Sequence, residues 1–236
     1  MGKIPSERME LLELIRESRR LSLVHEAILK KESDGDSAHD LAHLYRVAFW
    51  ACRILNRPEQ NESAIAAALL HDLVNVPKNH PDRSRASEFS AKEAVPILKK
   101  AGFSEEETDK ICTAIRQHSF SSGEKPVNAL AQSLQDADRL EALGAIGIMR
   151  CYSTGARMGT RYFHPSDPWA KDRSLNDSAY SLDHFFTKLL LLPDSMNTSA
   201  GRAEAEERAK TMRDFLEGLG EELGERCPEA PRGIEK

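Results

Sequence analysis

The sequence predicts an all-α protein built as a single-domain helical bundle. Apolar residues recur at spacings of three and four along most of the 236 residues, which is typical of amphipathic helices. No five-residue segment alternates between apolar and polar side chains as a half-buried strand would, and there is no internal repeat. Hydrophobic residues make up 40% of the chain, enough for a core. We expect one domain over residues 21–225, a peripheral N-terminal helix start at 1–20 and a flexible tail at 226–236.

The first two helices are predicted from apolar stripes separated by a polar break. The first runs from Ser6 to about Lys30, and residues 31–37 contain only charged and small polar side chains and a glycine. The second runs from about Asp40 to Leu55, where the sequence Asn56-Arg-Pro58 stops it.

The third helix, from about Glu62 to Leu73, is apolar on every side between Ala64 and Leu70. A helix of this composition belongs in the middle of a core. It ends at His71-Asp72, and a loop punctuated by two prolines follows over residues 75–83.

Two Ser-x-x-Glu sequences predict the starts of the fourth and fifth helices. Ser90 to Glu93 forms a predicted capping box for a helix that reaches Lys100. Ser104 to Glu107 forms another, for a helix that extends to about His118.

The C-terminal third begins with a sixth helix from about Val127 to Cys151. Residues 152–175 show no clear period and contain Gly, Pro, Arg and aromatic side chains. So long a loop is uncommon unless it serves a site. It could cover the base or ribose of a nucleotide, or it could pack on the surface or form a dimer contact. Two last helices follow, over 177–192 and 200–223.

Composition and charge exclude several functional classes. The net charge of −5 argues against a nucleic-acid-coating protein, which usually has a basic face. The longest apolar runs fall far short of the roughly 20 residues that cross a bilayer, and no secretory signal is visible. The four cysteines are widely spaced, as expected of reduced thiols. We therefore expect a cytoplasmic protein that binds neither nucleic acid nor membrane; a homo-oligomer remains open.

His71 and Asp72 are the first candidates for chemistry because they close an otherwise apolar helix. Their position carries both side chains into or beside the core. A buried carboxylate without a partner is unfavourable, and a metal ion is one of the few partners that satisfies a carboxylate and an imidazole together.

Other predicted helices also direct histidine or aspartate inward. His39 and His43 lie four residues apart on one face of the second helix. His118 continues the apolar stripe of the fifth helix, and Asp138 that of the sixth. Imidazole and carboxylate without thiolate suit a divalent ion of the Mn, Fe, Co, Ni, Zn or Mg group rather than a structural zinc site.

These residues lie in sequence strings that resemble the H…HD…D pattern of the HD-domain metal-dependent phosphohydrolases. The strings are His43-Leu-Tyr-Arg-Val47, Leu69-Leu-His-Asp72 and Asp136-Ala-Asp-Arg-Leu140. Further strings resemble a bacterial subgroup similar to nucleotide pyrophosphohydrolases, so that the likeness covers about residues 20–220. They are Asn79-His-Pro-Asp-Arg83, Gln117-His-Ser-Phe120, Gln135-Asp-Ala-Asp-Arg-Leu140, Gly144-Ala-Ile-Gly147, His184-Phe-Phe-Thr-Lys-Leu-Leu190 and Met196-Asn-Thr198.

The resemblance implies a divalent metal centre of one or two ions. The implied ligands are His43, His71, Asp72 and Asp138. Two alternatives stay open: His39 in place of His43, and Asp136 in place of Asp138.

The resemblance also implies a metal-dependent phosphohydrolase. Its substrate would be a nucleotide, such as a nucleoside or deoxynucleoside triphosphate, and metal-activated water would cleave a phosphoanhydride or phosphoester bond. The implied catalytic residues are Asp72, His118 and Lys78. The candidate substrate-binding residues are His39, Lys78, Arg83, Arg46, Arg139 and His118, because a phosphoryl group needs nearby positive charge.

Two other functions remain as alternatives. One is a di-iron oxygenase on the HD scaffold, which needs ligands beyond the H…HD…D set. The other is a helical module that binds a nucleotide without turnover; degenerate HD proteins usually lose a ligand, whereas here every ligand position is filled. The native metal, the leaving group and the preferred base and sugar are left open.

Overall fold

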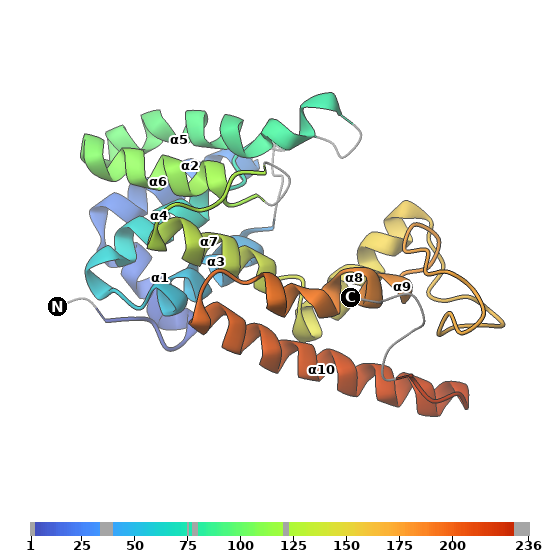
Figure 1. Cartoon of the computed structure of the whole chain (residues 1–236). Coiled ribbons are helices and arrows are strands. Elements are labelled where there is room, and N and C mark those ends of the chain that lie inside the picture. The colour runs from blue at the N-terminus through green and yellow to red at the C-terminus, as the bar shows by residue number, and fades with distance from the viewer. Residues whose placement is uncertain (1–2, 34–39, 75, 77–79, 120–122, 229–236) are drawn as a thin grey trace. The chain divides into compact units, whose positions relative to one another are not determined.

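The computed structural model confirms the predicted all-α fold. It describes residues 3–33, 40–74, 76, 80–119 and 123–228. The elements assigned in this part of the chain are helices, joined by loops that contain one isolated β-bridge between Arg161 and Tyr180. The chain forms two compact units, Met1–Asp138 and Arg139–Lys236 (Figure 1). None of the described helices has the length and apolar composition needed to span a bilayer. The domain limits given above stay a prediction.

The first unit is a bundle around α4. Its elements are α1 (Arg8–Glu17), α2 (Arg19–Ser33), α3 (Leu41–Leu55), η1 (Pro58–Gln60), α4 (Asn61–Leu70), η2 (Pro81–Arg85), α5 (Ala86–Ala101), α6 (Glu105–Gln117) and most of α7 (Ala129–Leu140). Helix α4 packs against α2, α3 and α6, and α5 lies along α6 (Figure 1). Every side chain from Ala64 to Leu70 is buried, so the apolar helix forms the centre of the core, as its composition predicts.

Local capping signals place several helix ends correctly. The Asp40 side chain accepts a hydrogen bond from the Ala42 amide at the start of α3, and Asn56 adopts a left-handed conformation at its end. Ser104 and Glu107 form the predicted capping box of α6, with both reciprocal hydrogen bonds present. These signals are reliable because each depends on residues within one helical turn.

The predicted single helix over residues 6–30 is wrong, because Ser18 divides it into α1 and α2. Ser18 has extended backbone angles (φ −82°, ψ 116°), and its Oγ accepts a hydrogen bond from the Leu21 amide at 3.3 Å. The Ser18 side chain therefore caps a second helix that begins one residue later.

The predicted capping box at Ser90 is also wrong. Helix α5 begins earlier, at Ala86, and Ser90 lies inside it. The Ser90 hydroxyl is buried and accepts a hydrogen bond from the Val74 amide at 3.0 Å. The Ser-x-x-Glu spacing here serves a tertiary contact that ties the chain after α4 to α5.

The predicted helix over 127–151 is two helices. α7 ends at Leu140, and α8 (Gly144–Met158) begins at a glycine with φ +67°. The predicted helix over 177–192 is likewise divided, into α9 (Asp183–Thr187) and η4 (Leu189–Ser195). Such breaks inside apolar stretches follow from tertiary packing, which the helical period does not record.

The second unit contains α8, α9, η4 and α10 (Ser199–Leu223), and α10 packs against α8 and η4. Its core includes Trp169, which is fully buried and whose Nε1 donates to the Glu225 carbonyl at 2.9 Å. Trp169 is thus committed to packing. The first part of the predicted 152–175 loop, up to Met158, belongs to α8.

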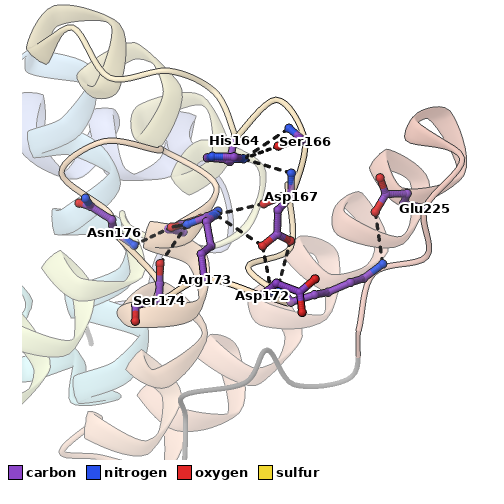
Figure 2. Close-up of polar contacts among 10 residues, drawn as sticks. His164, Ser166, Asp167, Asp172, Arg173, Ser174, Asn176 and Glu225 are labelled. Carbon is purple, nitrogen blue, oxygen red and sulfur yellow. Dashed lines mark hydrogen bonds and ion pairs between the residues drawn. The ribbon is translucent and has the colours of Figure 1, made fainter.

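The remaining loop is held by its own polar contacts, shown around Arg173 and Asp167 in Figure 2. The Arg173 guanidinium donates to both carboxylate oxygens of the buried Asp183, at 2.5 and 2.8 Å. The Asn176 amide donates to the same carboxylate at 2.6 Å. The Asp167 carboxylate accepts from the amides of residues 171 and 172. The long loop is therefore an ordered structure within the second unit.

Gly147 lies in the string Gly144-Ala-Ile-Gly147, at a position that has no space for a side chain. A Cβ at this position would lie 2.3 Å from the backbone oxygen of Ala142. We expect Gly147→Ala to lower the free energy of unfolding by about 2 kcal/mol, measured by urea denaturation. The control is Gly218→Ala in α10, where a Cβ meets no atom within 4 Å and should stabilise the helix by about 0.5–1 kcal/mol. Equal stability of the two variants would contradict this reading of Gly147.

Candidate metal centre

Four helices of the first unit bring five donor side chains together. His43 lies on α3, His71 and Asp72 follow α4, His118 follows α6, and Asp138 lies on α7. The three histidines are buried, whereas the side chains of Asp72 and Asp138 are 23% and 32% exposed. The carboxylates therefore form the side of the cluster that solvent or a substrate can reach.

The donor atoms form two overlapping groups that share His71. In one group, the Nε2 atom of His43 lies 3.3 Å from the His71 Nε2 and 3.6 Å from the Asp138 Oδ1. In the other, Asp72 has one oxygen 2.9 Å from the His71 Nε2 and the other 3.5 Å from the His118 Nε2. Within each group all donor atoms lie within 4.8 Å of one another.

The same backbone contact fixes the rings of His71 and His118. Each residue follows the last residue of its helix, and each Nδ1 lies against the carbonyl three residues earlier: Ala68 O at 2.7 Å and Ile115 O at 2.6 Å. A carbonyl oxygen only accepts hydrogen bonds, so Nδ1 carries the hydrogen in both rings. In a neutral ring, Nε2 then has a free lone pair.

This donor set fits a cation. Lone pairs of imidazole nitrogens that face carboxylate oxygens repel them unless a proton or a cation lies between. Histidine ligands of metals commonly donate their other ring N–H to a backbone carbonyl, as His71 and His118 do here. The absence of thiolate from both groups agrees with a non-structural divalent site.

The charges around the cluster shift two pKa values in opposite directions. Burial disfavours the protonated form of His71, but the carboxylates of Asp72 and Asp138 outweigh it and raise the pKa of His71. Burial also disfavours ionised Asp72, but the surrounding imidazoles hold the pKa of Asp72 well below its ordinary value. The Asp72 carboxylate is thus ready to bind a cation, and a proton competes with the cation for the His71 Nε2.

The choices between Asp138 and Asp136 and between His43 and His39 as ligands stay predictions. Asp136 is fully buried and belongs to neither donor group found among the described residues, whereas Asp138 joins the group of His43. His39 and Lys78, both candidates for substrate binding, lie outside the described residues.

The other predicted cations have different surroundings. The guanidinium of Arg83 donates to the Val76 carbonyl at 2.7 Å, which commits part of it to holding the chain after α4. Arg46 is half-buried on α3, three residues after His43. Arg139 belongs to the second unit and donates to the Ser195 carbonyl.

The groups that orient the donors were missed by sequence reasoning. Two are the backbone carbonyls of Ala68 and Ile115, which leave no signal in a side-chain pattern. Sequence reasoning also missed the buried contact in which Gln135 donates to the Gln117 carbonyl at 2.8 Å. Gln117 and Gln135 both lie in strings that carry the family resemblance, and this was the signal in the sequence that could have pointed to the contact.

A histidine, a His-Asp pair and an aspartate, brought together from separate helices into one cluster, are typical of one class of protein. The family model described as HD domain matches residues 40–143, a span that includes all five donor residues. A curated relative, the uncharacterized protein YpgQ of Bacillus subtilis, is 34% identical over 203 residues, covering 84% of this chain and 89% of the relative. The chain belongs to the HD-domain family.

Solved structures share this fold over most of the chain. The crystal structure of Bacillus subtilis YpgQ in complex with ADP has a TM-score of 0.63 and 29% identity, covering 86% of this chain and 96% of that one. An HD-superfamily hydrolase from Bacillus thuringiensis has a TM-score of 0.63 and 32% identity, covering 91% and 98%. Similarity over both units extends beyond the span of the family model.

Proposed function

We propose that this protein is a metal-dependent phosphohydrolase that cleaves a phosphoanhydride or phosphoester bond of a nucleoside or deoxynucleoside triphosphate. The observation that carries the proposal is the convergence of three imidazole Nε2 atoms and two carboxylates in one cluster. The relation to an HD-superfamily hydrolase supports the hydrolytic class.

The proposed ligands of one divalent cation are His43, His71, Asp72 and Asp138. A cation of the Mn, Mg, Fe, Co, Ni or Zn group, when bound, polarises a phosphoryl oxygen and lowers the pKa of coordinated water. The side chains of Asp72 and Asp138 are part-exposed, so the substrate would approach over these two carboxylates.

His118 is proposed to act on the phosphoryl group. Its Nδ1 is committed to the Ile115 carbonyl, so only Nε2 faces the cluster. In the protonated ring this Nε2–H donates to a phosphoryl oxygen or to the leaving group, and general acid catalysis of this kind contributes about 10²–10⁴-fold. Arg46, Arg83, Arg139, His39 and Lys78 are the proposed further contacts for phosphate oxygens.

A nucleotide is the proposed substrate because a relative was crystallised with one. YpgQ, similar to this chain over 86% of its length, has a structure in complex with ADP. A diphosphate bound by a relative fits a substrate or product that carries phosphoanhydride bonds.

The direct test is product analysis with a panel of ribo- and deoxyribonucleoside triphosphates and several divalent metals. We expect release of phosphate or pyrophosphate that depends on the added metal and stops with EDTA. Chromatography of the nucleotide product identifies the bond that is cleaved. Absence of turnover with every metal and nucleotide would contradict the proposal, and nucleotide binding without turnover would favour a non-catalytic module.

Metal affinity should depend on pH because a proton competes for His71. The raised pKa of His71 means that its Nε2 stays protonated to a pH above the ordinary value of 6.5. The cation binds only the deprotonated ring, so affinity should fall up to about tenfold for each pH unit below that pKa. Isothermal titration with Mn²⁺ between about pH 6 and pH 8, in buffers of different ionisation enthalpy, measures the protons released. Constant affinity without proton release would contradict the assignment of His71.

A further inference from the structure

Gln135 joins the helix that carries Asp138 to the helix that ends at His118. It lies on α7, is 2% exposed, and its Nε2 donates to the backbone oxygen of Gln117 at 2.8 Å. Gln117 is the last residue of α6 and is itself buried. Nothing in the proposed chemistry yet uses this buried amide.

The contact fixes the peptide group that connects Gln117 to His118. The oxygen of this planar group accepts from Gln135, and its N–H, which belongs to His118, points to the Ile115 carbonyl at 3.4 Å. Held at both ends, the peptide plane sets the position of the His118 Cα. The ring is then fixed by its own Nδ1 contact with Ile115.

The side chain of Gln117 also holds the end of α6, through contacts with residues that follow His118 in the chain. Its Oε1 accepts from the Val127 amide at 3.1 Å, and its Nε2 lies 3.4 Å from a carboxylate oxygen of Glu124. The backbone carbonyl and the side-chain amide of Gln117 are therefore both held by hydrogen bonds. His118 follows directly, and its Nε2 faces Asp72 at 3.5 Å.

We propose that Gln135 is a positioning residue that holds His118 against the metal centre through the Gln117 carbonyl. The inference rests on the proposed function. Gln135 precedes Asp138 by three residues, so both lie near one face of α7. One helix thus supplies a carboxylate to the centre and sets the place of the imidazole opposite. Loss of the Gln135 donor should let the His118 ring move while the proposed ligands stay in place.

The test is Gln135→Met, which keeps the side-chain length and removes the donor. We expect kcat to fall about tenfold or more, as for other groups that orient a site residue, with KM unchanged within about twofold. The matched control is Gln132→Met, the same change on the same helix at a half-buried position, which should behave like wild type. If Gln135→Met fails to fold, Gln135→Asn keeps the amide but shortens its reach.

A double-mutant cycle separates positioning from a general structural effect. In a His118→Ala background, Gln135→Met should cause no further loss beyond about twofold, because the group it positions is gone. An equal loss in both backgrounds, or no loss in either, overturns the proposal.

A second readout does not need activity. In metal-free protein labelled with ¹⁵N-histidine, the His118 ring should show one Nδ1–H tautomer in wild type and Gln132→Met. In Gln135→Met its two ring nitrogen shifts should move toward each other as the tautomers mix. Unchanged shifts overturn the proposal. Inactive wild type with this spectral change would instead overturn the proposed function and leave the role of Gln135 supported.

Discussion

Replacing Asp72 with asparagine is expected to lower nucleotide hydrolysis by at least about a thousandfold, the largest effect we expect from one substitution. Asp72 has one carboxylate oxygen 2.9 Å from the His71 Nε2 and the other 3.5 Å from the His118 Nε2, and it is one of the two carboxylates of the cluster. Asparagine has nearly the same volume but no charge, and loss of a charged ligand removes several kcal/mol of transition-state stabilisation. Phosphate release and Mn²⁺ titration measure the two consequences.

The control for Asp72→Asn is Asp109→Asn, an exposed carboxylate on α6. Its activity and metal affinity should equal those of wild type. Asp72→Asn should remain folded, because the Asp72 side chain is 23% exposed and asparagine has nearly the same volume. Activity within about tenfold of wild type, together with unchanged metal affinity, would show that Asp72 is not a ligand.

The fold class could be predicted from sequence because it depends on local periodicity. Helix ends marked by Asp40 and Ser104 were correct, since capping uses residues within one turn. Ser90 was misassigned because the same Ser-x-x-Glu spacing occurs inside α5, where its hydroxyl serves Val74. The break at Ser18 was missed because no Gly or Pro marks it.

The sequence predicts His71 and Asp72 as donors because a histidine and an aspartate at the end of an apolar helix have few ways to be satisfied. The structure brings both into the donor groups, and their role as ligands stays a prediction. The choice between Asp136 and Asp138 could not be made from helix faces alone. It depends on the rotation of α7, which the packing of the bundle sets and which turns Asp138 toward His43 at 3.6 Å. The orienting carbonyls of Ala68 and Ile115 were beyond reach, since a backbone acceptor exists at every position.

The same limit applies to the loop after α8. Its Gly, Pro, Arg and aromatic residues left open whether it covers the base or ribose of a nucleotide, packs on the surface or forms a dimer contact. The structure uses Trp169 as core and Arg173 as an internal ion-pair partner. Composition alone does not distinguish a cationic side chain that binds phosphate from one that neutralises a buried carboxylate. The burial of Asp183 assigns Arg173 to the second kind.

Arg173→Met is therefore expected to destabilise the protein by about 3 kcal/mol or more, because it leaves the Asp183 carboxylate buried without its counter-charge. The Asp183 side chain is 1% exposed, and the arginine supplies two of its hydrogen bonds. The guanidinium also lies 4.7 Å from the centroid of the Tyr180 ring. Urea denaturation of the full chain, followed by tryptophan fluorescence, measures the change, since Trp169 lies in the same unit.

A second substitution distinguishes lost charge pairing from lost packing. Asp183→Asn in the Arg173→Met background removes the unpaired charge and should restore part of the stability, because a neutral amide has a smaller desolvation penalty. The exposed pair Arg202–Asp194 serves as the control, and Arg202→Met should change stability little. If Arg173→Met were no more destabilising than Arg202→Met, the ion pair between Arg173 and Asp183 would not be what stabilises the loop.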